Sequence, residues 1–324
     1  MATVVIAGGT GFIGTQVARF LLEDGHKVVL FDCWPDLANE ADSLAARFQK
    51  HRIGPIRNDA ILVKGDVRDR SQIEACLSKY RPDYVIHLAA IADAKRAASN
   101  PAIAEPVNLF GVLNMLNALR NYPVHRFVLA SSSFVYGHFK YQPADEKHPL
   151  SPLDLYGNSK HSAEIMTRAF CSEYEIEHVI IRPSAVYGFG DSNLRVSRVF
   201  MEHAMTGRPL VINPGAGKLD FTYIEDIARG FALSLFATEA AGHTFNITRG
   251  EARSLEELAG IIKSHFPEVE VQMMPDHENG RPVRGTMDIS AARRILGYSP
   301  RYSLEEGIGK YAEHMKSHAE WFHE

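Results

Sequence analysis

The stretch TVVIAGGTGFIG, residues 3–14, joins a short apolar run to a glycine-rich turn. Gly8, Gly11 and Gly14 follow the spacing G-x-x-G-x-x-G, and a helical pattern begins directly after them. Such glycines permit a tight turn, let a pyrophosphate approach the backbone, and leave the free N–H groups of a helix N-terminus facing the anion. As a bare string the motif also fits a plain glycine turn. Its place between a strand and a helix predicts dinucleotide binding.

The pattern that starts in this stretch continues along the first half of the chain. Short, almost wholly apolar runs alternate with longer segments of helical periodicity, as expected for strands that are buried on both faces. The predicted strands are residues 3–7, 28–31, 60–63, 84–87, 126–130 and 178–181, and the predicted helices are 12–24, 70–80, 102–121 and 154–174. This order predicts an α/β fold, a Rossmann-type doubly wound parallel sheet, with its ligand crevice at the carboxyl ends of the strands.

After about residue 182 the regular alternation gives way to loops marked by glycine and proline. Further helices are predicted at 194–206, 225–237, 254–265 and 304–318. We therefore expect residues 1–182 to form an NAD-binding Rossmann domain to which later segments, about 211–245, return. Residues 183–324 are expected to form mainly a smaller, loop-rich substrate-binding lobe.

Composition excludes several classes of partner. The chain has 324 residues, 45% of them hydrophobic and 23% charged, with a formal net charge of −4, which is ordinary for a folded globule and gives no basic footprint for nucleic acid. Three scattered cysteines fit reduced thiols and predict a cytoplasmic protein. The sequence shows no basic leader and no run of membrane-span length, so no membrane association is expected. No histidine pair at helical spacing comes with a carboxylate, so no metal site is expected.

Two carboxylates follow predicted strands near the glycine turn. Asp32 ends the second strand, where it can accept hydrogen bonds from the ribose hydroxyls of adenosine and repel a 2′-phosphate, which favours NAD over NADP. Asp66, just past the third strand, can reach the adenine. The alternative is that both are turn or cap residues. The small residues of HLAAIADA, 87–94, would let the backbone approach the cofactor closely.

The segment LYGNSK, residues 155–160, places Tyr156 four positions before Lys160 at the start of a predicted helix, so both side chains lie on one face. Alone, this pair is common and fits a surface position. Here it follows a glycine loop and the cluster SSSFVYG, residues 131–137, at the end of the fifth strand. That order of motifs indicates a catalytic site.

With these motifs, the sequence resembles the extended short-chain dehydrogenase/reductase superfamily, specifically its NAD-dependent nucleotide-sugar epimerase/dehydratase branch, of which UDP-glucose 4-epimerase is a member. The resemblance runs nearly end to end. It is carried by GGTGFIG, GDVRD, HLAA, NLFGVLNML, SSSFVYG, YGNSK, RPSAVYG, DFTYIEDIARG, TFNIT and GRPVRGTMDISAARRILGYSPRYSLEEGI. The predicted cofactor-binding residues are Gly8, Gly11, Phe12, Ile13, Gly14, Asp32, Asp66, Val67, Leu88, Ala89, Ala90, Tyr156, Lys160 and Pro183.

The resemblance implies catalytic roles for Ser132, Tyr156 and Lys160. A free tyrosine has a pKa of about 10, so a tyrosine base needs nearby positive charge, which Lys160 and an oxidised nicotinamide would supply. Lys160 would also bind the nicotinamide ribose, and Ser132 would help to hold the reacting oxygen. In the 4,6-dehydratases an Asp and a Glu occupy the positions of Ser133 and Phe134. A site without that acid pair fits oxidation and reduction of one carbon, which is all that epimerisation requires.

Two positions depart from the family pattern. Ala185 stands where the family usually has an Asn, and Leu219 stands where it usually has an Arg. In the family, that Asn and that Arg commonly contact the nucleotide diphosphate. Arg281 matches a phosphate-binding arginine of the family, and Lys218 or Arg195 are expected to replace the missing donor, although both also fit solvated surface charges. The predicted substrate-binding residues are Ser133, Phe134, Arg195, Lys218 and Arg281.

The sequence therefore predicts an NAD-dependent nucleotide-sugar epimerase that acts at C4 of the sugar through a transient ketone. The alternatives are an NAD-dependent oxidoreductase acting on a sugar nucleotide or another secondary alcohol, and a non-catalytic NAD-binding relative. The choice between a hydroxymethyl group and a carboxylate at C6 stays open. Helices 102–121 and 154–174 resemble those that form the four-helix bundle of family homodimers, although their apolar faces could instead pack within one chain.

Overall fold

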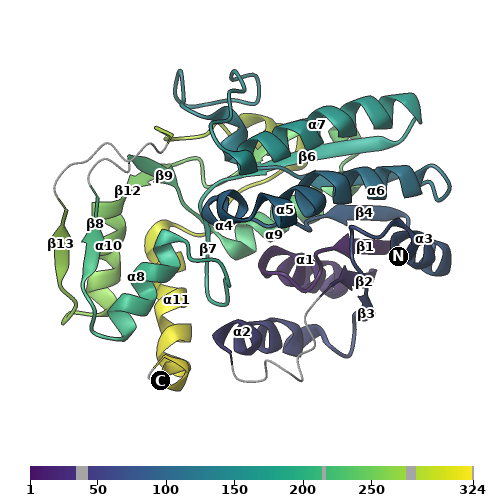
Figure 1. The fold of residues 1–324 in the computed structure, drawn as a ribbon. Helices are drawn as coiled ribbons and strands as arrows, with labels where there is room; N and C mark the ends of the chain where they lie inside the picture. The colour runs from purple at the N-terminus through teal and green to yellow at the C-terminus, as the bar shows by residue number, and fades with distance from the viewer. Residues whose placement is uncertain (34–42, 214–216, 275–281, 323–324) are drawn as a thin grey trace.

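The computed structural model describes residues 1–33, 43–213, 217–274 and 282–322 (Figure 1). Its centre is a seven-stranded sheet in the order β11-β6-β5-β4-β1-β2-β3, and every neighbouring pair is parallel. The strands are β1 (Thr3–Ala7), β2 (Lys27–Asp32), β3 (Ile61–Lys64), β4 (Tyr84–His87), β5 (Arg126–Ala130), β6 (Glu177–Pro183) and β11 (Thr244–Ile247). The predicted Rossmann-type parallel sheet is confirmed.

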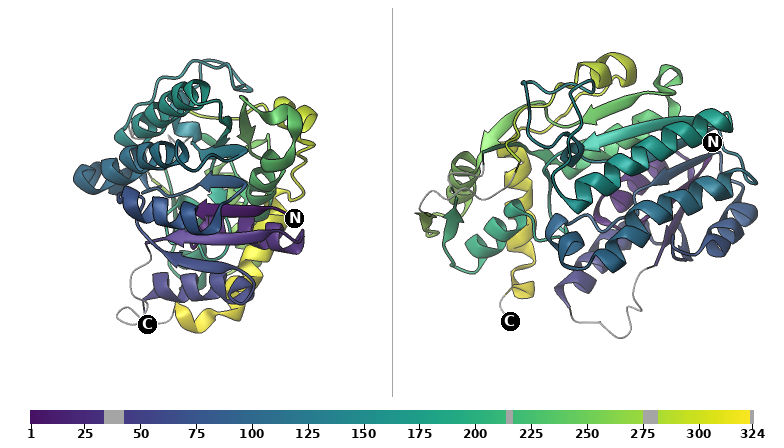
Figure 2. Two further views of the ribbon diagram at one scale, coloured as in Figure 1. Left: turned by 90° about the vertical axis from the view of Figure 1, so that its right-hand side faces the viewer. Right: turned by 45° about the horizontal axis from the view of Figure 1, so that its top comes forward.

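The strands are apolar throughout because both faces of the sheet are covered. In β1, Val4 and Ile6 belong to the hydrophobic core on one face, whereas Val5 and Ala7 belong to the core on the other. The first core is closed by α1 (Phe12–Glu23), α2 (Leu44–Ile53) and α9 (Ile224–Phe236), and the second by α3 (Arg70–Tyr80), α6 (Gly111–Leu119) and α7 (Leu155–Glu173). Figure 2 shows α6 and α7 lying side by side along the sheet. Side-chain alternation along each strand thus supplies both layers.

The predicted helix 102–121 is confirmed as a continuous helical stretch over Pro101–Leu119. It consists of α5 (Pro101–Glu105), a five-residue π-helical turn (Pro106–Phe110) and α6, and the short helix α4 (Ala94–Ser99) precedes it. Pro106 has no N–H to donate to the helix, which explains the local change of hydrogen bonding. Among the described helices, Pro101–Leu119 is long and apolar enough to cross a membrane by length and composition, and 44% of its 18-residue window is buried inside the protein.

The C-terminal part forms a smaller lobe at one side of the sheet (Figure 1). Its helices are α8 (Val196–Met205), α10 (Leu255–His265) and α11 (Leu304–Ser317), and its short strands are β7 (Val186–Tyr187), β8 (Leu210–Ile212), β9 (Lys218–Asp220), β10 (Thr222–Tyr223), β12 (Ala252–Ser254) and β13 (Val271–Met273). Its apolar side chains continue the first core of the sheet. Strand β11 and helix α9 pack on the sheet domain although they follow β8 in sequence. The predicted division into a domain at 1–182 and a lobe at 183–324 stays a prediction.

The strand order reverses between β1 and β4, because the chain proceeds outward from β1 through β2 and β3 and then returns to β4 on the other side. Parallel sheets bind ligands in the crevice that opens at the carboxyl ends of strands at such a switch point. The residues that follow β1, β2, β4 and β5 therefore line the candidate site.

Candidate functional site

The glycine turn between β1 and α1 has the shape that a pyrophosphate needs. Gly8 has a φ of +79°, and a Cβ at that position would lie 2.6 Å from the backbone nitrogen of Ala89. A Cβ at Gly14 would lie 2.5 Å from the carbonyl oxygen of Gly8, so both positions require glycine for close packing. Helix α1 has no side-chain cap, and its first intrahelical bond is from Thr15 N to Gly11 O, 3.1 Å. The preceding N–H groups of Phe12, Ile13 and Gly14 thus fit an anion.

Asp32 ends β2 beside this turn and holds it in shape. Its Oδ2 accepts hydrogen bonds from the Thr10 backbone N–H, 2.9 Å, and the Thr10 hydroxyl, 2.7 Å. Its Oδ1 accepts from the Cys33 N–H at 2.8 Å. The carboxylate therefore stabilises the turn, which was one of the two readings of this residue. Oδ2 is used by the two bonds from Thr10, whereas Oδ1 keeps a second lone pair for a ribose hydroxyl, so both readings are compatible.

Asp66 lies at the end of β3 with a well-defined local partner. The Arg68 side chain donates to both of its carboxylate oxygens, at 3.0 and 2.9 Å from Nε, and this arginine lowers the pKa of Asp66. The neighbouring Val67 is buried against the start of α6.

Small or apolar residues complete the cofactor side of the crevice. Leu88, Ala89 and Ala90 follow β4, and the Leu88 N–H donates to Ala7 O at 2.8 Å, which fixes them beside the glycine turn. Pro183 ends β6 two strands away. The predicted cofactor residues thus follow neighbouring strands of one sheet, and their glycines, free helix N–H groups and Asp32 fit a dinucleotide.

Tyr156 and Ser132 meet in the structure. Asp154 caps α7 by accepting from the Gly157 N–H at 2.7 Å, which puts Tyr156 in the first turn of the helix. Its hydroxyl hydrogen-bonds the Ser132 side chain, and its ring packs with Ala97, Ala104 and Phe134. Burial raises the pKa of Tyr156, while the nearby charge of Arg195 and the hydrogen bond with Ser132 lower it.

Lys160 lies one helical turn beyond Tyr156 and is completely enclosed. Its ammonium donates to the carbonyl oxygen of Ala130, the last residue of β5, at 2.8 Å. Burial lowers the pKa of Lys160 to about 8, and the carboxylate of Glu164 opposes this shift. The expected lowering of the Tyr156 pKa by Lys160 is not what the structure favours, because the ammonium is directed to the strand end and Arg195 is the cation that acts on the phenol.

The two residues that replace the dehydratase acids have cationic surroundings. The Ser133 hydroxyl donates to Ser184 Oγ at 3.2 Å and accepts from Arg284 Nη1 at 3.3 Å. The Arg284 guanidinium lies 4.5 Å from the centre of the Phe134 ring, and the centres of the Phe134 and Tyr156 rings are 5.4 Å apart in a T-shaped arrangement. Phe134 therefore lies between a cation and the phenol of Tyr156.

Arg195 caps the start of α8 and reaches toward Tyr156 from the C-terminal lobe. Its Nη1 donates to Val186 O at 3.0 Å, and its Nε lies 3.3 Å from the buried carboxylate of Asp191. These two contacts fix the guanidinium at the site, in contrast to the solvated surface position that was its alternative reading.

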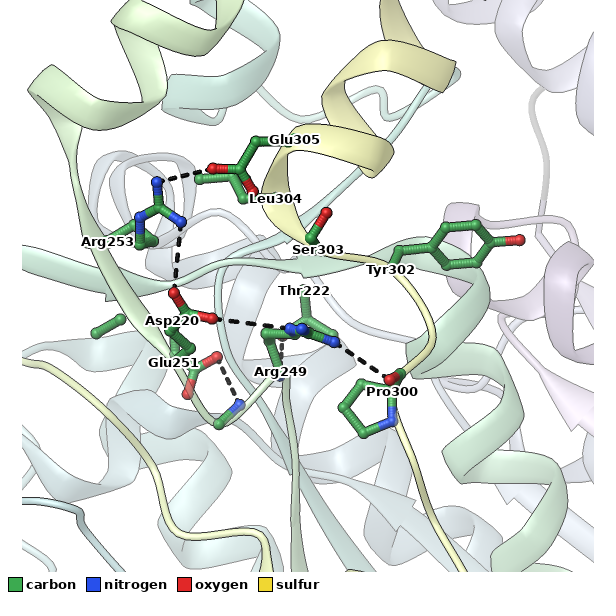
Figure 3. A network of polar contacts seen from close by, with 12 residues as sticks. Asp220, Thr222, Arg249, Glu251, Arg253, Pro300, Tyr302, Ser303, Leu304 and Glu305 are labelled. Atoms are coloured by element: carbon green, nitrogen blue, oxygen red, sulfur yellow. Dashed lines mark hydrogen bonds and ion pairs between the residues drawn. The ribbon is translucent and has the colours of Figure 1, made fainter.

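Leu219 and Lys218 lie on β9, which pairs with β12 so that Leu219 faces Arg253. Arg253 looks like a replacement for the missing arginine, but three carboxylates hold it: Glu257 at 2.8 Å, Glu305 at 2.9 Å and Glu251 at 3.4 Å. Figure 3 shows Arg253 beside Glu305 and Glu251. This guanidinium therefore ties β12 to α10 and α11.

Lys218 is exposed, and its charge acts on Glu257 rather than on any catalytic residue. Lys218 is thus not brought to the catalytic group by the contacts of the described residues. The predicted contact Arg281 lies outside the described residues.

Ala185, the other departure from the family pattern, has a strained backbone. Its φ is +35°, a conformation that asparagine and glycine adopt more readily than alanine. The strain lies in the segment between β6 and β7, next to Ser184, which accepts a hydrogen bond from Ser133. The backbone at Ala185 thus has a conformation that suits Asn better than Ala.

Sequence reasoning missed two residues that the structure brings to the site. Arg284 lies three positions after Arg281 in the motif GRPVRG and carried no separate signal. Glu164 follows Lys160 by four residues, so its place on the same helix face was available from the spacing. Among the described residues, no group of three or more metal-ligating side chains is found.

The parallel sheet, the glycine turn with its free helix N–H groups, and a buried Tyr-x-x-x-Lys pair that meets a serine define a nicotinamide-dependent enzyme of the Rossmann type. The model of the NAD-dependent epimerase/dehydratase family matches residues 4–248, and the chain belongs to that family. The predicted family and the cofactor NAD are confirmed.

Relatives match over nearly the whole chain. A Methanocaldococcus jannaschii protein provisionally named UDP-glucose 4-epimerase is 30% identical over 97% of this chain and 98% of its own length. The Thermotoga maritima UDP-glucose 4-epimerase, solved with UDP-glucose, has a TM-score of 0.85 at 26% identity and covers 97% of this chain and 99% of its own. The Thermus thermophilus UDP-glucose 4-epimerase, solved with NAD, has a TM-score of 0.85 at 26% identity and covers 98% of this chain and 99% of its own.

Proposed function

We propose that this protein is an NAD-dependent nucleotide-sugar epimerase that inverts C4 of the sugar. The observation that carries the proposal is the composition of residues 131–134 at the end of β5, which we call the shelf. There Ser132 meets Tyr156, and Ser133 and Phe134 stand where a dehydratase has two acids. Without those acids the site can move a proton and a hydride at one carbon only. The relatives named as UDP-glucose 4-epimerases support the same activity.

Each group at the shelf has one role in the proposed reaction. Tyr156 takes the proton of the substrate hydroxyl, Ser132 donates a hydrogen bond to the same oxygen, and Arg195 favours the charged phenolate. NAD supplies the chemistry of accepting a hydride from that carbon and returning it. Inversion then requires that the ketone turns over within the site before the proton and hydride are given back to its other face.

The roles of the surrounding residues are part of the proposal. Gly8, Gly11 and the N–H groups of Phe12, Ile13 and Gly14 would hold the pyrophosphate, and Asp32 would hold the adenosine ribose. The adenine would lie near Asp66 and Val67, and the nicotinamide near Leu88, Ala89, Ala90, Lys160 and Pro183. Ser133, Phe134 and Arg195 would contact the sugar, with Arg281 on the diphosphate. Lys218, which is exposed beside Glu257, stays a predicted contact of the diphosphate.

We infer a cytoplasmic homodimer. Ile103 and Phe110 near α5, with Leu155, Ile165 and Met166 on α7, are 37–54% exposed. They lie on helices that pack together along one face of the sheet. A second copy would bury these side chains in a four-helix arrangement. The three free cysteines are consistent with a reducing compartment.

The test is product analysis by NMR with UDP-, GDP-, CDP- and dTDP-sugars and no added NAD. Formation of a C4 epimer, with no net change in NADH absorbance, is the expected result, because the bound cofactor is regenerated in each turnover. A Tyr156→Phe sample is the matched control, since it removes only the hydroxyl that accepts the proton. Failure across the panel would reject the epimerase assignment.

A second function has a specific observation in its favour. Ala185 and Leu219 lack the polar side chains that commonly bind the diphosphate, and Arg253 is held by three carboxylates. An NAD-dependent oxidoreductase acting on a smaller secondary alcohol would not need those contacts. Stoichiometric NADH formation with free NAD and simple polyols would favour this second function.

A further inference from the structure

A buried carboxylate lies directly behind the serine cluster. Glu164, on α7 one turn beyond Lys160, has a fully buried side chain. Its Oε1 accepts from the Ser131 hydroxyl at 2.5 Å and from Arg182 Nε at 2.8 Å. Its Oε2 accepts from Arg182 Nη2 at 2.7 Å and from Arg168 Nη2 at 2.8 Å. The carboxylate thus joins α7 to both β5 and β6.

Ser131 lies between the two residues that contact Lys160 and Tyr156. The residue before it, Ala130, offers its carbonyl oxygen to Lys160, and the residue after it, Ser132, hydrogen-bonds Tyr156. The Ser131 backbone is itself fixed by its N–H, which donates to Ile181 O at 2.7 Å. A shift of Ser131 would therefore move both neighbours relative to the catalytic pair.

The charges around Lys160 make Glu164 its counter-charge. Lys160 is fully enclosed, and burial opposes its charged form. Glu164 on the same helix favours the ammonium, whereas His87 on β4 faces it as a neutral imidazole whose pKa burial lowers to about 3. The cations that face Glu164 are Arg182 from β6 and Arg168 from α7.

Arg182 has contacts of its own that anchor this carboxylate. Its Nη1 donates to the Tyr136 hydroxyl at 2.9 Å, and Tyr136 donates to Asn246 on β11 at 2.7 Å. The ion pair is thus tied through Tyr136 to β11, which restricts its movement. A rigid buried acceptor is what a group needs if it is to fix a catalytic geometry.

We propose that Glu164 is a positioning residue for the catalytic pair: it fixes the end of β5 through Ser131, and its charge balances that of the buried Lys160 ammonium. The inference rests on the proposed function only where turnover is measured. The charge balance can be tested without any substrate.

Three variants separate the parts of this role. Glu164→Gln removes the charge and keeps an oxygen for Ser131. Ser131→Ala removes the hydroxyl and keeps the Glu164–Arg182 pair. Arg168→Gln removes the partly exposed cation that contacts the same carboxylate. Arg168→Gln is the matched control. In this variant Arg182 still donates two hydrogen bonds to Glu164, so the Lys160 titration and the turnover should stay near those of the wild type.

The first readout is the titration of Lys160 by NMR of lysine labelled with carbon-13 at Cε, with Lys160→Met used to assign the signal. In Glu164→Gln we expect the titration to move down by about one pH unit or more, because the favourable charge is lost. In Ser131→Ala and Arg168→Gln it should stay near the wild-type value. A wild-type titration in Glu164→Gln would overturn the charge balance.

The second readout is turnover with the best sugar nucleotide. Ser131→Ala should lower kcat about tenfold with little change in KM and in bound NAD, because the geometry and not the binding is disturbed. Unchanged kcat in Ser131→Ala would overturn the positioning role. The Ser131→Ala measurement remains decisive even when Glu164→Gln does not fold because Arg182 is left unpaired. If the wild type turns over no sugar nucleotide, the epimerase proposal fails, while the Lys160 titration still tests the charge balance.

Discussion

His87 should make the protein sensitive to acid in a way that one substitution removes. The side chain ends β4 with none of its surface exposed, and neither ring nitrogen has a hydrogen-bond partner among the described residues. Burial, together with the charge of Lys160, lowers the pKa of His87 to about 3 from the ordinary 6.5. The imidazole is therefore neutral in the folded protein over the range in which the unfolded chain takes up a proton.

The direction and size of the pH effect on stability follow from the difference between the folded and unfolded pKa values of His87. A folded pKa below the unfolded one means that the stabilising contribution is complete above pH 6.5 and is lost as the pH falls toward 3. At 1.36 kcal/mol per unit, the full loss is about 5 kcal/mol, of which about 2 kcal/mol has gone at pH 5. At neutral pH, His87→Leu also removes two buried groups without partners, so it should be at least as stable as the wild type.

The assay is urea unfolding of the wild type and His87→Leu at pH 7.5 and pH 5, with equal slopes checked at each pH. The free-energy difference between the two should shift by about 2 kcal/mol in favour of the variant on going to pH 5. His125→Leu is the control, because that histidine is 75% exposed. A difference that does not change with pH would refute the reasoning, since it would mean that His87 is protonated, or hydrogen-bonded to water, in the folded state.

Three further substitutions test the site. Tyr156→Phe should keep bound NAD and lower kcat by about 100-fold or more, as loss of a general base does, and near-wild-type turnover would remove Tyr156 from the mechanism. Asp32→Ala should weaken discrimination against NADP, measured as the ratio of the two dissociation constants, and an unchanged ratio would leave Asp32 only its bonds to Thr10. Ala185→Asn should raise stability by about 1 kcal/mol by relieving the positive φ, and should lower KM for sugar nucleotides; a drop in melting temperature would contradict the strain argument.

The sequence predicted the elements whose cause is local. Six of the seven strands of the central sheet were found within one or two residues, because a strand buried on both faces reads as a continuous apolar run, and β11 was missed. Helix α2, residues 44–53, was missed because half of LAARFQKHRI is charged or polar and little apolar periodicity remains. The lobe strands of two or three residues were missed because their partners, such as β9 and β12, are more than thirty positions apart.

For the predicted catalytic residues, too, the sequence indicated the local part of the arrangement and not the contacts between distant elements. Ser132, Tyr156 and Lys160 come from two motifs of recognisable spacing, and the structure gathers them at the end of β5. The direction of Lys160 toward Ala130, and the approach of Arg195 from another lobe, depend on how distant elements pack. No spacing rule carries that information. Glu164 was the one residue that helix geometry alone offered and that was not taken up.

The three serines of SSSFVYG explain why such a polar stretch can end a buried strand. Ser131 turns inward to Glu164, Ser132 meets the catalytic phenol, and Ser133 is shared by Ser184 and Arg284. Each hydroxyl is buried and each has a partner, so the cluster costs little in desolvation.

Only the middle serine is left to face a reacting oxygen, with an aromatic ring and a guanidinium beside it instead of two acids. Proton removal from a neighbouring carbon would need a base at the positions of Ser133 or Phe134. A serine held by Arg284 and a phenylalanine cannot supply one, which favours reversible oxidation at a single carbon over elimination.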